Sequence, residues 1–328
     1  MTLALTPLSP QPWATAALRE VWGQTLCDLT RDGANTVVLD GDLANSTRAD
    51  IFAECYPDRF FEMGIAEQNM AGVAAGLATL GYTPWLSSFA AFLTSRDLDQ
   101  IRVVIAQPSL DVKICGGYSG ILTGKTGKTH QSVEDIATFR ALPGIDIIAP
   151  ADGQELRAAM AAIAVSGRPT YLRLTRDASP VIFSEDYDFE IGQAVLLRDG
   201  NDLGIVSTGV QTVRVLETAD RLGERGLSVA VLHVPTIKPI DEDAIVDIAE
   251  RTNLIMTAED HSIIGGLGGA VAELLGERRP TLMKRIGIQD RFGESGANDA
   301  LLEKYGLSVD YMFARALDLL ERKGLETA

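Results

Sequence analysis

Residues 61–78 read FEMGIAEQNMAGVAAGLA, a polar turn that runs into a long segment of small residues. The segment Gly64–Leu80 is rich in glycine and alanine and predicts a helix. Glu67 lies in the first turn of this otherwise small and apolar helix. Its carboxylate is either a charge that the helix dipole favours at the N-terminus, or an acid–base group held against a ligand.

Short β-branched runs alternate with helical stretches on both sides of this segment. Such repetition predicts a mostly parallel sheet with helices on both faces, an α/β fold. The expected strands are 36–39, 84–88, 112–115, 145–148 and 171–174. The expected helices are 13–31, 64–80, 89–106, 133–141 and 153–165.

The polar, acidic segment Asp177–Glu190 interrupts this rhythm and predicts a linker between two domains. A second alternating block follows, so we expect two doubly wound domains, residues 1–188 and 189–328, which suits a length of 328 residues. The expected strands of this block are 203–207, 228–233, 253–257 and 281–285. Its expected helices are 210–225, 241–250, 266–275 and 309–320.

Composition and charge exclude several classes of protein. The chain is 46% hydrophobic with a formal net charge of −16, a profile that argues against a disordered chain and against nucleic acid as the main ligand. No apolar run is long enough to span a membrane, and the first residues lack the features of a signal peptide. Three widely spaced cysteines without CxxC spacing indicate a reducing, cytoplasmic location, and three histidines make a metal site on this chain improbable.

Ligands of open parallel sheets bind beyond the carboxyl ends of the strands, on loops that lead into helices. Three loops of the first domain fit this description: Asp40–Ser46, Phe61–Asn69 and the glycine-rich Gly116–Gln131. The last of these ends in Thr-His-Gln and contains His130, for which a structural and a functional role are both open.

Two further features leave alternatives open. Phe89 and Phe92 are three residues apart and share one face of a helix, either as core residues or as a shelf for a flat heterocycle. The glycines of Ile264–Gly269 predict a tight turn from strand to helix, with phosphate binding as the weaker alternative.

The order of these motifs resembles the transketolase family. FEMGIAEQNMAGVAAGLA, then SSFAAF, then a glycine-rich loop ending in THQ resemble the pyrimidine-binding region, and EDHSIIGGLGGAVAE at residues 259–273 is similar to the family's C-terminal domain. The resemblance covers essentially the whole chain. It implies a thiamine diphosphate-dependent transferase that moves a two-carbon ketol unit between sugars.

The resemblance assigns roles to residues on the pyrimidine side. Glu67 is expected to hydrogen-bond N1′ of the thiamine aminopyrimidine, where a buried carboxyl group acts best. Phe92, with Phe89 nearby, is expected to stack on the pyrimidine ring. Asp42 and Leu43, in a stretch similar to the family's DLAxS motif, are expected to contact the cofactor.

The resemblance also places the substrate. His130 is expected to face the reacting carbons and to stabilise developing alkoxides. Ser46 of the DLAxS-like stretch and Arg176 of LRLTRD match positions that hold the distal phosphate of the substrate. Tyr118 occupies a position where typical transketolases have a histidine that contacts the donor sugar.

One departure from the family predicts a second subunit. The family holds the diphosphate through Mg²⁺ and a GDG motif, and this chain has Gly41-Asp42-Leu43 but no GDG. We therefore expect one half of a split enzyme, whose N-terminal partner subunit holds the diphosphate and Mg²⁺. A two-plus-two assembly is the simplest closed arrangement.

A second departure concerns the substrate. The family's acidic EDGPTH is replaced here by KTGKTH, residues 125–130. Lys125 and Lys128 are either solvated loop charges, or they favour a substrate that is more anionic than ordinary pentose phosphates or differently substituted. The alternatives to a transketolase subunit are the β subunit of a 2-oxo acid dehydrogenase E1 component, a deoxyxylulose-phosphate synthase-like enzyme, and a non-catalytic subunit that keeps the fold.

Overall fold

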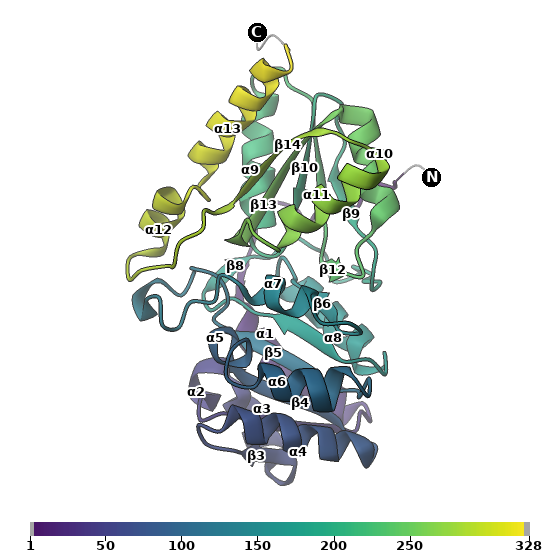
Figure 1. Cartoon of the computed structure of the whole chain (residues 1–328), viewed down its shortest axis with the longest axis vertical. Coiled ribbons are helices and arrows are strands. Elements are labelled where there is room, and N and C mark those ends of the chain that lie inside the picture. Colours follow the sequence, from purple (N-terminus) through teal and green to yellow (C-terminus); the bar gives the residue numbers. More distant parts are fainter. Residues whose placement is uncertain (1–2, 325–328) are drawn as a thin grey trace.

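The computed structural model describes residues 3–324, so residues 1–2 and 325–328 of the two expected domains lie outside the described part. Two α/β blocks are stacked along the long axis of the molecule (Figure 1), one built on a seven-stranded sheet and one on a five-stranded sheet. A separate two-stranded antiparallel sheet is formed by β1 (Thr15–Ala17) and β8 (Ala178–Pro180). The predicted fold of two doubly wound α/β domains is confirmed.

The larger sheet has the strand order β12-β6-β7-β5-β4-β2-β3. All neighbouring strands are parallel except β12, which belongs to the second block in sequence and adds an antiparallel edge. The strands are β2 (Thr36–Asp40), β3 (Phe60–Glu62), β4 (Thr83–Phe89), β5 (Lys113–Gly117), β6 (Asp146–Ile148), β7 (Thr170–Arg173) and β12 (Thr236–Lys238).

Helices cover both faces of this sheet. One apolar cluster packs α1, α3 and α8 on one face, and a second packs α4, α5, α7 and a π-helical segment, Ile101–Ala106, on the other. The helices are α1 (Leu18–Arg31), α2 (Ala44–Thr47), α3 (Ala49–Cys55), α4 (Glu67–Thr79), α5 (Ala90–Leu93), α6 (Leu98–Gln100), α7 (Asp135–Arg140) and α8 (Gly153–Ala164). Short 3-10 turns lie at Pro57–Arg59 and Gly124–Thr126.

The second sheet has the order β14-β13-β10-β11-β9 and is parallel except for β9. Its strands are β9 (Val195–Arg198), β10 (Leu203–Ser207), β11 (Val229–His233), β13 (Leu254–Ser262) and β14 (Leu282–Ile288). Its helices are α9 (Gln211–Gly223), α10 (Glu242–Thr252), α11 (Leu267–Arg278), α12 (Asn298–Tyr305) and α13 (Val309–Arg322).

Three predicted elements differ from the structure. The first helix begins at Leu18, because Thr15–Ala17 pair with β8, and the same pairing places a strand inside the expected linker 177–190. The expected helix 89–106 is divided into α5, α6 and the π-helical segment. Thr94 and Ser95 hydroxyls hydrogen-bond back to the carbonyls of Ala90 and Ala91, a local competition that ends helices.

Candidate active site

The expected site residues gather at the carboxyl edge of the larger sheet. Strands β2, β4 and β5 are neighbours and parallel, so the loops that follow them leave the same edge. Ser46 follows β2. Phe89 is the last residue of β4, and Phe92 lies just beyond it in α5. Tyr118 follows β5. Arg176 follows β7, the next strand of the sheet.

Glu67 is the first residue of α4 and is buried, with 2% of its surface exposed. Oε1 of Glu67 accepts a hydrogen bond from Nη1 of Arg96 at 2.8 Å. The Arg96 guanidinium also lies 4.1 Å above the ring of Phe92. A cavity of about 390 Å³ opens at this end of α4 and is lined by Glu67 and Arg96, together with Ile65, Ala66, Gln68 and Asn69.

Asp97 adds a second carboxyl group near Glu67, one that the sequence pattern did not predict. The side chain is fully buried, and neither carboxylate oxygen has a hydrogen-bond partner among the described residues. Burial, and to a lesser degree the charge of Glu67, raises the pKa of Asp97 to about 8. No sequence signal marks it, because an aspartate after Arg96 is typical of an ordinary solvated turn.

Four rings form one cluster beside Arg96. Phe89 stacks on Tyr118 with 4.0 Å between ring centroids, and Phe92 lies 5.7 Å from Phe89. His130 presents its edge to both phenylalanines, at 5.7 and 5.4 Å. Phe89 is only 4% exposed and has one face covered by Tyr118, so the half-exposed Phe92 is the more accessible of the two phenylalanine rings.

Two guanidinium groups meet at the hydroxyl of Tyr118. Nε of Arg176 donates to this oxygen at 3.2 Å, and Nη1 of Arg19 donates to it at 3.4 Å. Arg19 also donates to the backbone oxygen of Ser46 at 2.9 Å. Arg19 was not predicted from the sequence, because nothing in the pattern of α1 distinguishes it from a surface arginine. The arrangement creates a positive site at the carboxyl edge of the sheet.

Asp42 and Leu43 lie on the loop after β2, and their backbone N–H groups donate hydrogen bonds to neighbouring carboxylates. The Asp42 N–H donates to Oε1 of Glu62 at 3.0 Å, and the Leu43 N–H donates to Oδ1 of Asp40 at 2.6 Å. Burial raises the pKa of Asp40 to about 6, opposed by a hydrogen bond from Ser87. Within residues 3–324, neither Asp42 nor Leu43 forms a hydrogen bond or ion pair with Glu67 or with the ring cluster.

The glycine-rich loop of the first block, which carries Tyr118 and His130, is hydrogen-bonded to residues of the second block. Both carboxylate oxygens of Asp260 accept from the Ile121 N–H, at 3.1 and 3.2 Å. Gly120 has φ +73°, and a Cβ at this position would lie 2.0 Å from Oδ2 of Asp260. Farther along the loop, Gln131 donates to the backbone oxygen of Glu294 at 3.1 Å.

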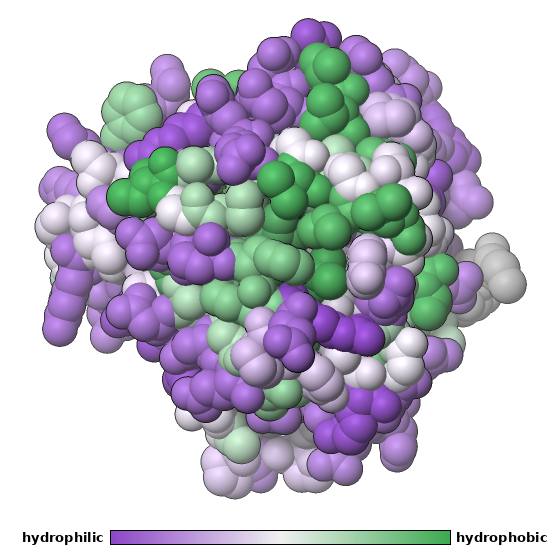
Figure 2. Space-filling model, turned by 90° about the horizontal axis from the view of Figure 1, so that it is seen from below, coloured by the Kyte–Doolittle hydropathy of each residue, from purple (hydrophilic) through white to green (hydrophobic). Residues whose placement is uncertain are grey.

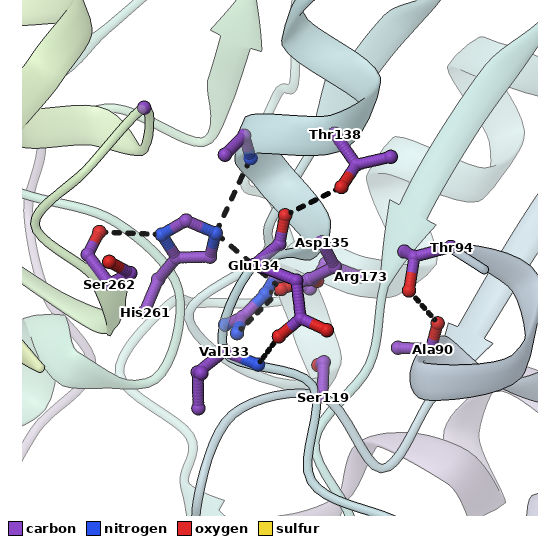
Figure 3. Close-up of polar contacts among 12 residues, drawn as sticks. Ala90, Thr94, Ser119, Val133, Glu134, Asp135, Thr138, Arg173, His261 and Ser262 are labelled. Atoms are coloured by element: carbon purple, nitrogen blue, oxygen red, sulfur yellow. Dashed lines mark hydrogen bonds and ion pairs between the residues drawn. The ribbon is translucent and has the colours of Figure 1, made fainter. Parts of the chain in front are cut away.

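Near this loop, a cluster of buried polar side chains from both blocks links the two blocks by hydrogen bonds (Figure 3). Arg173 donates to both carboxylate oxygens of Asp135. It also donates to the backbone oxygen of Asp260. His261 accepts from the Ala137 N–H at the start of α7 and donates from Nδ1 to the Ser262 carbonyl. Burial lowers the pKa of His261 to about 4, so the ring is neutral near pH 7.

The glycine-rich segment before α11 forms the tight turn from strand to helix that the sequence predicts. The carboxylate of Glu259 accepts from the N–H groups of Leu267 and Gly268, both at 2.7 Å. A carboxylate of the chain thus occupies the N-terminus of α11, which favours a structural role of this turn over phosphate binding.

Comparisons with known proteins agree with this geometry. Residues 14–181 match the transketolase pyrimidine-binding domain, and residues 192–312 match the transketolase C-terminal domain. The chain is 40% identical to the 6-deoxy-6-sulfo-D-fructose transketolase subunit SqwH of Clostridium sp. (strain MSTE9), over 93% of this chain and 95% of that subunit. It is 35% identical to one subunit of the apulose-4-phosphate transketolase of Phocaeicola vulgatus, over 93% and 98% of the two chains.

A solved structure described as a split-gene transketolase, inactive β4 tetramer, superposes with a TM-score of 0.87 at 43% identity. The superposition covers 93% of this chain and 98% of that one. No helix within residues 3–324 is both long and apolar enough to cross a membrane. Membership of this family implies dependence on thiamine diphosphate. The chain belongs to the transketolase family of transferases, as a C-terminal subunit of the split type.

Proposed function

We propose that this chain supplies the pyrimidine half of a thiamine diphosphate site and transfers a two-carbon ketol unit between sugars that carry a distal oxyanion. The observation that carries the proposal is the buried carboxyl group of Glu67, placed at the start of α4 in a cavity beside Phe92 and Arg96. A carboxyl group and an accessible ring are what a protonatable aminopyrimidine needs for a hydrogen bond and for stacking.

The residues of the cavity fit this cofactor. When bound, thiamine diphosphate supplies the carbon nucleophile and the electron sink of the reaction. Glu67 would bind N1′ through the carboxylate oxygen that Arg96 does not use, and Arg96 fixes the orientation of that carboxylate. Phe92 would contact the pyrimidine ring, while the more deeply buried Phe89 supports Phe92 and Tyr118 from behind. Asp42 and Leu43 remain expected cofactor contacts on the loop after β2.

The positive site is proposed to hold the distal oxyanion of the sugar. Arg19 and Arg176 converge on Tyr118, next to Ser46, and guanidinium groups bind phosphate and sulfonate through paired hydrogen bonds. The names of two relatives describe a sulfonated and a phosphorylated sugar as their substrates, and neither is an ordinary pentose phosphate. This supports a non-standard, anionic sugar here.

His130 is proposed to donate a hydrogen bond to an oxygen on the reacting carbons. Nδ1 of His130 lies 2.8 Å from Oγ1 of Thr129, which leaves Nε2 for the substrate. Lys125 and Lys128 are exposed on the same loop, where they would add positive potential near an anionic sugar.

We propose that an N-terminal partner subunit completes the site, holds the diphosphate and Mg²⁺, and docks on the face that carries α4. Phe61, Ile65 and Leu80 expose large apolar side chains on and beside β3 and α4, and Ile65 is 73% exposed. Figure 2 views the molecule from this end and shows apolar side chains gathered into a continuous patch. Ile65 also lines the Glu67 cavity, so the cavity opens at the edge of this patch.

An α2β2 assembly would then place each thiamine between two polypeptides. The three free thiols suit the cytoplasmic location that we propose.

Reconstitution tests this proposal. The chain is mixed with the N-terminal transketolase subunit, thiamine diphosphate and Mg²⁺, and ketol transfer is measured with sulfofructose, with apulose 4-phosphate and with xylulose 5-phosphate. We expect turnover in the mixture but not with either subunit alone. Turnover by this chain alone, or acylation of a lipoyl acceptor in place of ketol transfer, would overturn it.

A further inference from the structure

A cavity of about 460 Å³ lies between the two blocks, outside the proposed active site. The first block contributes Leu122, Thr175 after β7, Asp177, and the three residues of β8. The second block contributes the starts of α9, α12 and α13 (Figure 1). The cavity is therefore built by both domains.

Two hydroxyl groups of residues that line this cavity lack hydrogen-bond partners in the described part of the chain, and a nearby arginine has only a weak one. Oγ1 of Thr175 and Oγ of Ser179 are buried, at 5% and 7% exposure, and have no hydrogen-bond partner among the described residues. Arg214 of α9 is half-buried, and its guanidinium has only a 3.5 Å contact with Oε1 of Gln211 and no ion pair within residues 3–324. Buried polar groups without partners are rare in folded proteins, so the hydroxyls of Thr175 and Ser179 mark this wall of the cavity as unusual.

The N-terminus of α13 adds positive potential to the same cavity. α13 has 14 residues, and its cap residue Ser308 and first residue Val309 both line the cavity. The helix dipole favours an anion at this end. Burial also lowers the pKa of Arg214, and the charges of Asp260, Glu217 and Asp299 oppose this shift without forming an ion pair with it within residues 3–324.

None of the three carboxylates that line the cavity, Asp177, Glu217 and Asp299, forms an ion pair with Arg214. Asp177 is occupied on both oxygens, by Nη1 of Arg176 at 2.6 Å and by Nδ2 of Asn298 at 2.5 Å. Glu217 and Asp299 are exposed, so their charges are screened by solvent and salt.

We propose that this cavity binds a small oxyanion metabolite, which presents a phosphate or carboxylate group to Arg214, Thr175 and Ser179. The cavity is larger than a bare phosphate, and its wall includes Leu122 and Leu302, so the ligand carries an organic body that packs against them. Asp177 separates this ligand from Arg176, which makes the two anion sites neighbours but distinct.

Titration calorimetry with the full chain tests the proposal, with inorganic phosphate and citrate as probes at constant ionic strength in chloride. The R176Q variant removes the neighbouring anion site and serves as the background. In this background we expect at least one probe to bind, R214Q to weaken that binding about tenfold or more, and S179A to weaken it about threefold. Tighter binding of phosphate than of citrate would assign a phosphate group, and the reverse a carboxylate.

Two outcomes would overturn the proposal. One is loss of all binding of both probes in R176Q, and the other is unchanged binding when R214Q is added. Should R214Q fail to fold, crystals of the wild-type chain soaked in selenate give an independent result. We expect an anomalous peak beside Arg214, and its absence at saturating selenate would contradict the site.

Discussion

Nη1 of Arg96 donates to Oε1 of Glu67 at 2.8 Å, while the same guanidinium lies over the ring of Phe92. One half-exposed arginine thus connects the carboxyl group proposed to bind the aminopyrimidine with the ring proposed to stack on it. The pairing uses one carboxylate oxygen and leaves the other for a ligand. Arg96 therefore acts as a positioning residue for Glu67.

Replacing Arg96 with glutamine is expected to weaken thiamine diphosphate binding by the two-subunit enzyme about three- to tenfold. The effect is moderate because the guanidinium is 45% exposed and solvent screens part of the ion pair. The measurement is the apparent affinity for the cofactor in the turnover assay. R102Q, an exposed arginine paired with Asp99, is the matched control, and equal effects of both variants would contradict the role of Arg96.

The Y118F variant is expected to raise KM for an anionic sugar about three- to tenfold and to leave kcat within about twofold. The hydroxyl accepts from both Arg19 and Arg176, so its loss frees the two guanidinium groups and misplaces them. A sugar without the distal oxyanion should show no change in KM. Y56F, whose hydroxyl contacts the Cys27 carbonyl, serves as the control. An equal rise in KM for both kinds of sugar would count against the positive site.

Asp97 is expected to make the folded chain less stable as the pH rises. Burial raises its pKa to about 8, whereas the unfolded carboxyl group loses its proton near its ordinary value of 3.8. Between these values only the unfolded state releases the proton, so the free energy of unfolding falls as the pH increases from about 4 to about 8. The D97N variant has no carboxyl group to titrate, so its free energy of unfolding should not fall in this way. We expect it to be more stable than the wild-type chain by roughly 2–5 kcal/mol at pH 8 and by far less at pH 5.

Denaturant unfolding of D97N at pH 5, 7 and 8 measures this difference. The exposed Asp99 provides the control variant D99N, for which no pH-dependent gain is expected. A stabilisation by D97N that does not grow with pH would show that Asp97 does not carry an unpaired buried carboxyl group.

The G120A variant is expected to destabilise the chain by at least about 2 kcal/mol more than G144A. Both glycines have a positive φ, so both substitutions cost about 1 kcal/mol in backbone strain. Only at Gly120 would the new Cβ collide with the Asp260 carboxylate, at 2.0 Å, whereas at Gly144 the nearest atom lies 3.7 Å away. Thermal or denaturant unfolding of the two variants gives the comparison, and equal losses would contradict the contact between the blocks.

G120A should also lower turnover, because the loop carries both Tyr118 and His130. Activity is measured at a temperature where the variant is folded. Full activity of folded G120A would show that Asp260 does not set the position of the loop.

The sequence predicted the parts of the molecule that local pattern determines. The alternating strands and helices of both sheets are present in the structure. The resemblance to the family, not local pattern, named Phe92, Tyr118, His130 and Arg176, which lie together at one edge of the larger sheet. The family of the chain followed from short motifs around Glu67.

What the sequence could not predict depends on contacts between distant segments. Arg19 reaches Tyr118 across 99 positions of the chain, and a helical arginine carries no sign of such a contact. β12 crosses from the second block to the edge of the first sheet, a pairing that its three residues do not encode. The burial of Asp97 depends on the break between α5 and α6, which the apolar pattern of residues 89–106 conceals.

The rate of ketol transfer by the two-subunit enzyme carrying E67Q tests the central claim most directly. Glutamine keeps the size of the side chain but cannot exchange a proton with the aminopyrimidine. We expect a loss of at least about 100-fold in kcat, while E54Q, an exposed glutamate, leaves the rate unchanged. Turnover of E67Q at the wild-type rate would contradict the account.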